Sequence, residues 1–251
     1  MLSDKEVISF RVSDGNTIRL EYRSALASTA MLAREYAAAG YPDRYAIFTE
    51  NQGENGDRGG LYLSCILRPS IFPSQAGLIG PLAAVAFATA LEEHTSKKMG
   101  IGWVSDIYCD GVKIGGCSVE GKLDNFTSYE YMIVTFAIRL DEQIFPPRLT
   151  DMVRKVFEAD NTSVAMIIAK TVLNKFFALY RDLKTPEKHM NVYRSKFALL
   201  GKKIKYYDDG RKRSARVVDV DKEHCTLLIE TKEGAKLQIA SPSMVIIPNK
   251  I

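Results

Sequence analysis

The sequence predicts an α+β fold, with strands and helices mixed through a large N-terminal part and a small β-barrel at the C-terminal end. Three observations lead to this prediction. Short apolar segments with the two-residue alternation of strands recur up to about residue 140. Amphipathic segments with helical spacing lie between and after them. From about Leu200 the pattern changes to short strands separated by tight turns.

The N-terminal part contains clear strand and helix patterns. Thr17–Tyr22 alternates apolar and polar residues, which predicts a strand with one buried side. Ser28 and Thr29 are good N-cap residues for a helix that ends at Gly40. Tyr45–Thr49 is a short apolar run, which predicts a buried strand.

Further elements follow from the spacing of apolar residues in the central part. We expect strands at Leu61–Leu67 and Tyr129–Leu140, a hairpin of Ile101–Tyr108 and Val112–Glu120, and helices at 77–94, 149–160 and 162–183. The hairpin is the firmest of these predictions, because Asp110-Gly111 is typical of a two-residue turn between strands. Glu50–Gly60 is polar and rich in glycine, so we expect a loop there.

The chain after about Leu200 has the pattern of a separate small β-domain. Its predicted strands are 202–207, 215–220, 226–231 and 236–240. We place the boundary between Thr185-Pro186 and Leu200-Gly201, close to residue 190. This divides the chain into a larger domain of residues 1–190 and a smaller domain of residues 191–251.

Composition excludes several classes of protein. With 46% hydrophobic and 25% charged residues, the chain has an ordinary globular composition. The apolar stretch Ala76–Leu91 contains two glycines and a proline and falls short of the ~20 residues that a membrane-spanning helix needs. Charges near the N-terminus argue against an export signal. The four cysteines lack CxxC spacing, so we expect reduced thiols in a cytoplasmic protein and no protein-bound metal.

Basic residues are concentrated in one segment, although the overall charge of +4 is modest. The segment contains Lys202, Lys203, Lys205, Arg211, Lys212, Arg213 and Arg216. We interpret these residues as the solvated face of the small β-domain, with a functional anion-binding face as the alternative. The nearly balanced totals of 34 basic and 30 acidic residues do not by themselves predict a nucleic-acid partner.

The predicted hairpin carries the most informative group of residues. Its second strand begins with Lys113, followed by Gly115 and Gly116. Glycines have no Cβ, so an ammonium group and closely approaching backbone amides could address one anionic ligand here. A surface lysine after a turn is the alternative interpretation, and spacing alone does not decide between the two.

The order of several motifs resembles that of the biotin–protein ligase family over about residues 21–247. The hairpin motifs are Trp103, Asp106-Ile107-Tyr108, Asp110-Gly111, Lys113-Ile114 and Gly116, which fall where this family places its Trp-Pro-Asn-Asp hairpin and the following lysine. Ser28-Thr29, Glu50-Asn51-Gln52, Leu61–Ser64 and Arg68-Pro69 are similar to its earlier segments, and Tyr193-Arg194 and Leu200–Lys203 to the start of its C-terminal module. Each piece is short, but their order and spacing are specific.

This resemblance implies a fold, an activity and a set of site residues. The fold would be a class II synthetase-like mixed sheet flanked by helices, with a C-terminal SH3-like barrel. The activity would be ATP-dependent attachment of biotin to a lysine of the carrier domain of a biotin-dependent carboxylase, through biotinyl-adenylate, with Mg²⁺ accompanying ATP. The implied residues are Lys113 and Arg58 for catalysis; Ser28, Thr29, Gln52, Gly59, Gly60, Gly115 and Gly116 for the substrate; and Trp103, Asp106 and Arg139 for the nucleotide.

The departures from the family pattern lie mainly on the nucleotide side. The loop 53–60 is short and carries one arginine beside Glu54 and Asp57, whose charges would repel a phosphate. Thr135–Arg139 replaces a glycine-rich segment of the family. Losing one charge-assisted contact to an anion costs about 1.5–3 kcal/mol. These changes motivate an alternative, a catalytically impaired relative that binds a biotin-like ligand or a carrier protein without turnover.

Other readings have less support from the residues. A lipoyl or octanoyl transferase of the same superfamily would carry an Arg-Arg-x-Ser-Gly-Gly run, which is absent from the sequence. The N-terminal segment has no room for a helix-turn-helix domain, so we expect no DNA binding. We also expect no membrane association, and a monomer or homodimer. Phe176, Phe177 and Tyr180 have helical spacing, which predicts core packing rather than a platform for stacking ligands.

Overall fold

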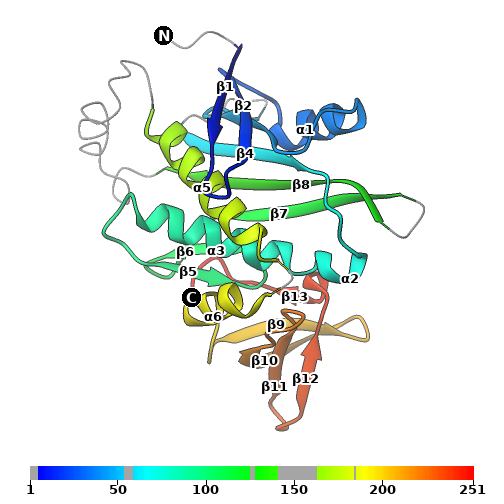
Figure 1. The fold of residues 1–251 in the computed structure, drawn as a ribbon. Helices are drawn as coiled ribbons and strands as arrows, with labels where there is room; N and C mark the ends of the chain where they lie inside the picture. Colours follow the sequence, from blue (N-terminus) through cyan, green and yellow to red (C-terminus); the bar gives the residue numbers. More distant parts are fainter. Residues whose placement is uncertain (1–4, 54–58, 125–127, 141–162, 184) are drawn as a thin grey trace.

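The molecule has two β-sheets, one at each end, with some of its helices between them (Figure 1). The computed structural model describes residues 5–53, 59–124, 128–140, 163–183 and 185–251. Within these residues, one sheet is mixed and has eight strands, and the other is antiparallel and has five. The α+β fold class predicted from the sequence is confirmed.

The eight-stranded sheet forms the larger part of the molecule. In spatial order its strands are β1 (Lys5–Arg11), β2 (Thr17–Arg23), β3 (Tyr45–Thr49), β4 (Gly60–Leu67), β8 (Ser128–Arg139), β7 (Val112–Asp124), β6 (Asp106–Cys109) and β5 (Met99–Gly102). The β2–β3 pair is parallel, because the helix between these strands carries the chain back across the sheet. The remaining neighbours pair antiparallel.

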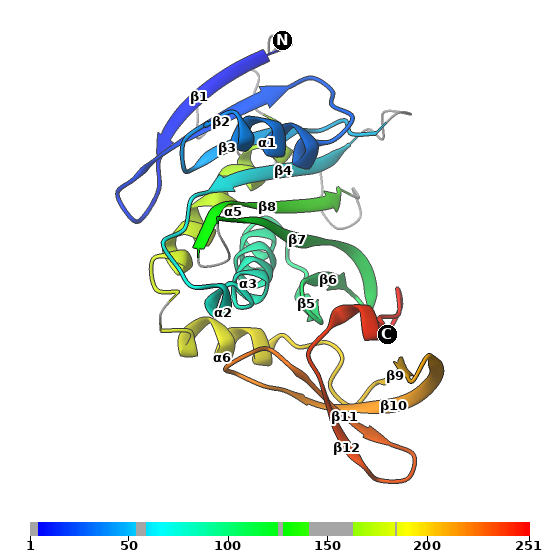
Figure 2. The same cartoon turned by 90° about the vertical axis from the view of Figure 1, so that its right-hand side faces the viewer.

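Helices cover both faces of this sheet. Helix α1 (Thr29–Ala38) packs Ala33 and Ala37 against Ile47 and Ile133 on one face. Helices α3 (Ile79–Glu92) and α5 (Val164–Tyr180) cover the other face, where their apolar side chains join one large core. Figure 2 shows α3 end-on beneath the strongly curved strand β7. The predicted core packing of Phe176 and Phe177 is confirmed, since both are fully buried.

The C-terminal sheet is antiparallel. Its order is β12 (Lys236–Ile239), β11 (Leu227–Thr231), β10 (Arg211–Val220), β9 (Lys203–Asp208) and β13 (Val245–Ile246), the last preceded by the 3-10 turn η1 (Pro242–Met244). The predicted barrel is therefore observed as a five-stranded antiparallel sheet. Two short helices, α2 (Pro73–Ala76) and α6 (Glu187–Ser195), lie between the two sheets (Figure 1). Ile204, Val217 and Leu227 belong to the same apolar core as the large sheet, so packing is continuous between the two parts.

Several element predictions need correction. The strand predicted at 101–108 is broken into β5 and β6 by a turn at residues 103–105. Strands β1 and β13 and helix α6 were not predicted. The predicted helix 149–160 lies outside the described residues. The Asp110-Gly111 turn is confirmed, with positive φ values of 48° and 78° that suit a two-residue hairpin turn.

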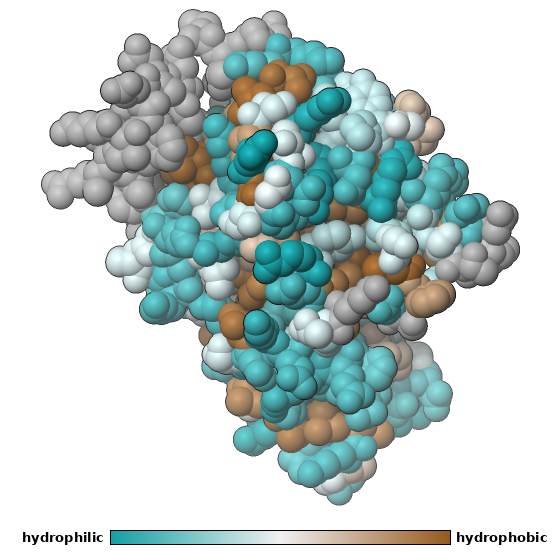
Figure 3. Space-filling view, viewed as in Figure 1, coloured by the Kyte–Doolittle hydropathy of each residue, from teal (hydrophilic) through white to brown (hydrophobic). Residues whose placement is uncertain are grey.

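The surface agrees with the ordinary composition. The face seen in Figure 3 is mostly hydrophilic, and its hydrophobic residues form separate patches rather than one continuous area. Among the described helices, none combines the length and the apolar character needed to cross a bilayer.

Candidate functional site

The predicted site residues that the structure describes gather at one end of the eight-stranded sheet. The parallel strands β2 and β3 end there, and β4 and β7 begin there. Ser28 and Thr29 follow β2, Gln52 follows β3, Gly59 and Gly60 precede or begin β4, Arg139 ends β8, and Lys113, Gly115 and Gly116 lie early in β7. Arg58 lies outside the described residues. Residues drawn from five different segments are thus placed on one rim.

A polar group forms where α1 begins. Ser28 caps the helix by accepting a hydrogen bond from the backbone N–H of Met31, as its position in the sequence predicts. The backbone N–H and the hydroxyl of Thr29 both donate to Gln52 Oε1, at 2.8 and 3.1 Å. A parallel bridge between Leu26 and Gln52 keeps the two segments side by side. The side chain of Gln52 is therefore held in one orientation by its carbonyl oxygen, which leaves its NH₂ group as the donor for a ligand.

A row of hydroxyl groups continues across the sheet from the cluster formed by Ser28, Thr29 and Gln52. Ser64 on β4 is fully buried and lies 2.9 Å from Thr29 Oγ1 and 2.8 Å from Thr135 Oγ1 on β8. Ser118 on β7 is directly opposite Thr135 in the strand pairing. Opposed residues of an antiparallel pair project from the same face. Ser64, Thr135 and Ser118 therefore form one rung of side chains leading away from α1, and this rung was not identified from the sequence.

The hairpin places a charged pair at the same rim. Lys113 Nζ lies 2.7 Å from Asp106 Oδ1, and both side chains are partly exposed. Strands β6 and β7 pair with Asp106 opposite Gly116 and with a bulge between Ile107 and Tyr108. The sequence assigned Lys113 to catalysis and Asp106 to the nucleotide. In the structure these two side chains form one ion pair. A cation that already has a carboxylate partner is held in a fixed position, and it remains able to receive a second anion on its exposed side.

Gly115 and Gly116 are required by the packing of the strands themselves. A Cβ on Gly115 would lie 2.4 Å from the backbone oxygen of Ala137, and one on Gly116 would lie 2.9 Å from that of Ser105. These distances are shorter than a side chain tolerates, so β6, β7 and β8 approach one another closely only because both positions are glycine. Gly60 has a related constraint, because its Cβ would lie 2.4 Å from the ring of Tyr62.

Two buried aromatic residues join the hairpin to the rest of the molecule. Trp103 is 2% exposed, and its indole N–H donates to the backbone oxygen of Cys225 at 2.6 Å. The hydroxyl of Tyr193 on α6 donates to the backbone oxygen of Val104 at 2.9 Å. The polar group of Trp103 is thus used within the protein, and its ring is almost entirely buried.

Residues 249–251 clamp the turn of the hairpin. The backbone N–H of Lys113 donates to the oxygen of Asn249 at 2.8 Å, and the N–H of Ile251 donates to the oxygen of Gly111 at 2.8 Å. Val112 and Lys250 form an antiparallel bridge between these bonds. The strand that carries Lys113 is therefore tied by backbone hydrogen bonds to a distant segment of the chain, since the bridged residues Val112 and Lys250 are 138 positions apart.

A cleft of about 860 Å³ opens beside the charged pair. Its walls come from α2 and the start of α3, from the β6–β7 hairpin, and from the C-terminal sheet. Trp103, Asp106, Lys113 and Ser118 all line it. A volume of this size suits a small organic molecule or a nucleotide. The cleft is therefore the candidate binding site, and the hydroxyl row reaches it through Ser118.

Arg139 occupies the opposite end of the same rim. It ends β8, is exposed, and pairs with Gly60 in the strand register. The next residue, Leu140, donates its backbone N–H to the oxygen of Gly59 at 3.1 Å. Arg139 thus lies next to Gly59 and Gly60, the last residues of the loop that contains Arg58, for which a catalytic role was predicted.

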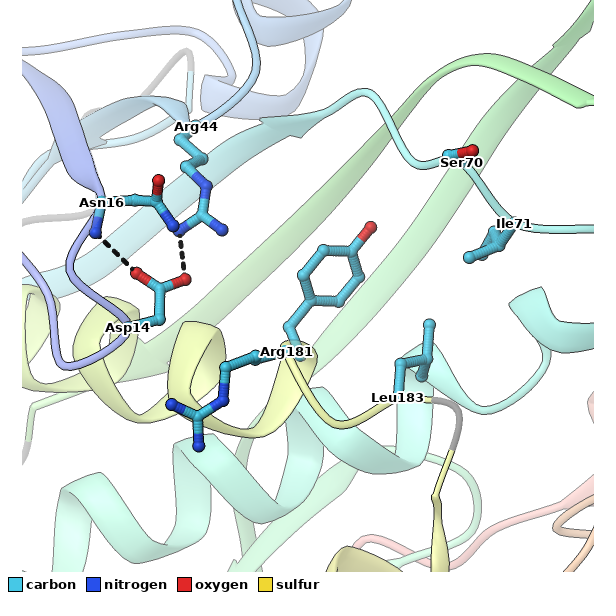
Figure 4. A pocket seen from close by; sticks show the side chains of 8 residues that line it. Asp14, Asn16, Arg44, Ser70, Ile71, Arg181 and Leu183 are labelled. Carbon is cyan, nitrogen blue, oxygen red and sulfur yellow. Dashed lines mark hydrogen bonds and ion pairs between the residues drawn. The ribbon is translucent and has the colours of Figure 1, made fainter.

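A smaller pocket of about 300 Å³ lies at the C-terminal end of α5 (Figure 4). Asp14 and Asn16 approach Arg44 on one side of it, and Ser70 and Ile71 lie on the other. The charge of Arg44 is already balanced by Asp14 at 2.8 Å, and its guanidinium rests 4.2 Å from the centre of the Phe177 ring. These contacts use the arginine to hold the loop before β3 against α5, so we assign this pocket a structural role.

Comparisons with known proteins agree with the resemblance in the sequence. No protein-family model matches the chain. The bifunctional ligase/repressor BirA of Bacillus subtilis is 25% identical over 232 residues, covering 86% of this chain and 71% of that protein. The chain is thus similar in sequence to a biotin ligase that is also a repressor. Solved structures of the Aquifex aeolicus biotin protein ligase, including one in complex with biotin and ATP, superpose with a TM-score of 0.67 at 20–21% identity and cover 90% of this chain and 96–97% of theirs.

One further solved structure is similar to this chain in fold. A biotin protein ligase-like protein of unknown function from Silicibacter superposes with a TM-score of 0.65 at 15% identity, covering 89% of this chain and 94% of that one. At this level of identity the likeness shows a shared fold. For this chain the substrate must be decided by the residues around the cleft, above all by those that depart from the family pattern.

Proposed function

We propose that this chain is an ATP-dependent ligase that activates biotin or a related carboxylic acid as an acyl-adenylate and then transfers the acyl group to a lysine of a carrier domain. The observation that carries this proposal is the Lys113–Asp106 pair on the rim of the cleft, on the same sheet end as Thr29 and Gln52. The arrangement offers a cation for a phosphate or carboxylate and, a short way along the sheet, hydrogen-bonding groups for the remainder of an acid.

The chemistry needs positioning and charge neutralisation rather than a protein nucleophile. In the first step, a carboxylate oxygen of the acid attacks the α-phosphorus of ATP, and pyrophosphate leaves. In the second, the carrier amine attacks the acyl carbon, AMP leaves, and the amine loses a proton. Negative charge concentrates where the two anions meet, and Lys113 would stabilise it there. Asp106 holds the ammonium group in place and Gln52 orients the acid, which together bring the reacting atoms close.

The described residues offer little to hold a metal ion by themselves. They contain no group of three or more His, Cys, Asp or Glu side chains with metal-binding geometry. Asp106 is the acidic group beside Lys113 in the cleft, and its Oδ1 is engaged by that lysine. Mg²⁺ typically reaches such sites bound to phosphate oxygens, with only one or two protein carboxylates. We propose that Mg²⁺ enters with ATP and that Asp106 contributes at most one ligand.

The carrier, the domains and the compartment belong to the same proposal. The carrier would be the biotin carrier domain of a biotin-dependent carboxylase, which must bring its lysine to the cleft. Residues 1–190 would form the ligase domain and residues 191–251 the SH3-like domain, with α6 spanning the boundary. Free thiols at all four cysteines are consistent with a reducing cytoplasm, where ATP is available.

The test is a ligase assay with two readouts. Purified protein is incubated with labelled biotin, Mg-ATP and a biotin carrier domain, and both the free biotinyl-adenylate and the acid-stable label on the carrier are measured. We expect both products. Without the carrier, the adenylate alone should accumulate. A competent biotin protein ligase run in parallel checks the reagents.

A non-catalytic relative is the second candidate, favoured by one observation. Glu54 and Asp57 leave Arg58 as the only cation of the 53–60 loop, in contrast to the several arginines that the family places there. Saturable binding of biotin or of the carrier, with neither product in the assay above, would establish this second function. Formation of the adenylate at a rate above that of protein-free solution would exclude it.

A further inference from the structure

The outer side of the C-terminal sheet carries cations that the proposed reaction does not use. Alternation along β9 and β10 turns Ile204, Ala215 and Val217 into the core and the residues between them to solvent. Figure 2 shows β11 and β12 at the end of the molecule away from the eight-stranded sheet. We call the outward side of β9, β10, β11 and β12 the basic face. Its exposed cations are Lys203, Lys205, Lys212, Arg216 and Lys236.

The strand register places three of these cations in one row. Lys203 on β9 is directly opposite Arg216 on β10, Arg216 is opposite Glu230 on β11, and Glu230 is opposite Lys236 on β12. Neighbouring strands lie about 4.8 Å apart, so the row gathers three cations around a single carboxylate. Within the parts of the chain that the structure describes, none of the five cations of the basic face forms a salt bridge. Their charge is therefore available to an anion from outside.

A hollow of about 450 Å³ opens beside this row. Its polar lining consists of Lys203, Ser214, Arg216, Glu230, Thr231 and Lys232. Lysine, arginine and hydroxyl side chains are the groups with which proteins hold the phosphates of a nucleic acid. None of the residues that line the hollow also lines the large cleft. The hollow is thus a separate place for a phosphate, away from the proposed reaction.

An exposed aromatic ring lies among the cations of the basic face. Tyr207 on β9 is 40% exposed and is directly opposite Lys212 on β10. Lys205 precedes it by two residues and so projects from the same side, roughly 6.6 Å away along the strand. Proteins that bind single strands combine cations along the backbone with aromatic rings on which bases stack. A membrane surface would instead call for several apolar side chains among the cations.

We propose that the basic face binds single-stranded nucleic acid without reading its sequence. The cations follow the backbone, the hollow holds a phosphate, and a base stacks on Tyr207. This partner differs from an operator duplex, whose major groove a helix-turn-helix domain reads. No cation of the basic face lines the large cleft except for none that the reaction uses, so the inference does not depend on the proposed function.

The first test is the salt dependence of binding. Fluorescence anisotropy of a labelled oligouridylate, titrated with the full chain between about 50 and 200 mM salt, gives the slope of log affinity against log salt. Each phosphate contact on a single strand contributes about 0.7 to this slope, so Lys205→Gln combined with Arg216→Gln should reduce it by about 1.4. The matched control combines Lys98→Gln with Lys188→Gln, which removes the same charge from exposed positions elsewhere. Its slope should equal that of the wild type.

The second test separates a nucleic acid from other polyanions. Tyr207→Ala should weaken binding of the oligouridylate about five- to 150-fold, the range for losing one stacked base. Tyr207→Phe keeps the ring and should bind within about twofold of the wild type. Polyphosphate has phosphates but no bases, so its affinity should be unchanged in Tyr207→Ala. Thermal unfolding of each variant checks that the sheet stays folded.

Several results would overturn the inference. One is the absence of oligouridylate binding by the wild-type protein at about 50 mM salt. Another is an equal loss of affinity in the control pair, which would show a general charge effect rather than a site. Unchanged binding in Tyr207→Ala would show a cluster of cations with no preference for nucleic acid. Salt-sensitive binding of an acidic protein such as the carrier domain, with none of the oligouridylate, would assign the face to a protein partner instead.

Discussion

Replacing Lys113 with alanine should abolish most of the activity while leaving the fold nearly as stable as before. The lysine's partner, Asp106, is 2.7 Å away, and the two side chains are 36% and 22% exposed. Partly exposed pairs of this kind contribute about 0–1 kcal/mol to stability, because water screens them and the side chains lose freedom. A charge-assisted contact to a phosphate or carboxylate in the reaction contributes about 1.5–3 kcal/mol, which corresponds to a factor of roughly ten to 150 in kcat/KM.

The assay for this prediction is pyrophosphate release under Mg-ATP over a range of acid concentrations, which gives kcat/KM, alongside urea unfolding of the same preparations. Lys122→Ala is a close control, because Lys122 lies on the same strand and pairs with Glu130 at the same distance of 2.7 Å, but does not line the cleft. Its activity should stay within about twofold of the wild type. Equal activities for the Lys113 and Lys122 variants would refute the assigned role of Lys113, since the pair would then be only a surface contact.

Three further predictions concern stability. Burial lowers the pKa of His189 from its ordinary value near 6.5 to about 4, so the folded state disfavours the protonated form and stability should fall as the pH drops from about 6.5 towards 4. The loss approaches at most about 3 kcal/mol, and urea unfolding of His189→Met across this range should show a flatter pH profile. Gly115→Ala should lower the free energy of unfolding by about 1–3 kcal/mol or prevent folding, because its Cβ would lie 2.4 Å from a backbone oxygen of β8. The control is Gly77→Ala, whose Cβ would have no atom within 4 Å and which should unfold at nearly the wild-type temperature. Trp103→Phe removes the donor to the buried oxygen of Cys225 and should cost about 1–3 kcal/mol in denaturant unfolding; an unchanged midpoint would show that this bond contributes nothing to the docking of the C-terminal sheet.

The local sequence pattern was sufficient to predict an element where any apolar surroundings would bury it equally well. Tyr45–Thr49 is apolar except for Thr49 and is buried throughout, so its strand could be predicted with its bounds. The break at residues 103–105 could not, because tryptophan and valine at 103 and 104 favour strands. It is imposed by distant partners, since Trp103 donates to Cys225 and Tyr193 donates to Val104. Neither partner is visible in a local window of sequence.

The candidate site likewise has some features that the local sequence predicts and others that distant partners determine. Lys113 and the turn before it were identified because one short segment holds both. The pairing of Lys113 with Asp106 depends on the register of two strands, with a bulge between them, which spacing alone does not fix. The row from Thr29 through Ser64 to Thr135 is still less local, because Ser64 and Thr135 are 71 positions apart. Only the pairing of β4 with β8 brings those hydroxyls together.

The backbone hydrogen bonds between the hairpin and residues 249–251 couple the stability of the hairpin to the docking of the C-terminal segment. Lys113 cannot shift along its strand unless Asn249 and the segment leading from β13 shift with it. An anion on its ammonium group should therefore also stabilise the docking of the C-terminal sheet, and docking should favour the anion by the same coupling free energy. The C-terminal sheet is thus a thermodynamic partner of the ligand: loosening it should weaken binding at Lys113 on the facing wall of the cleft, and occupancy of the cleft should slow the opening of the sheet.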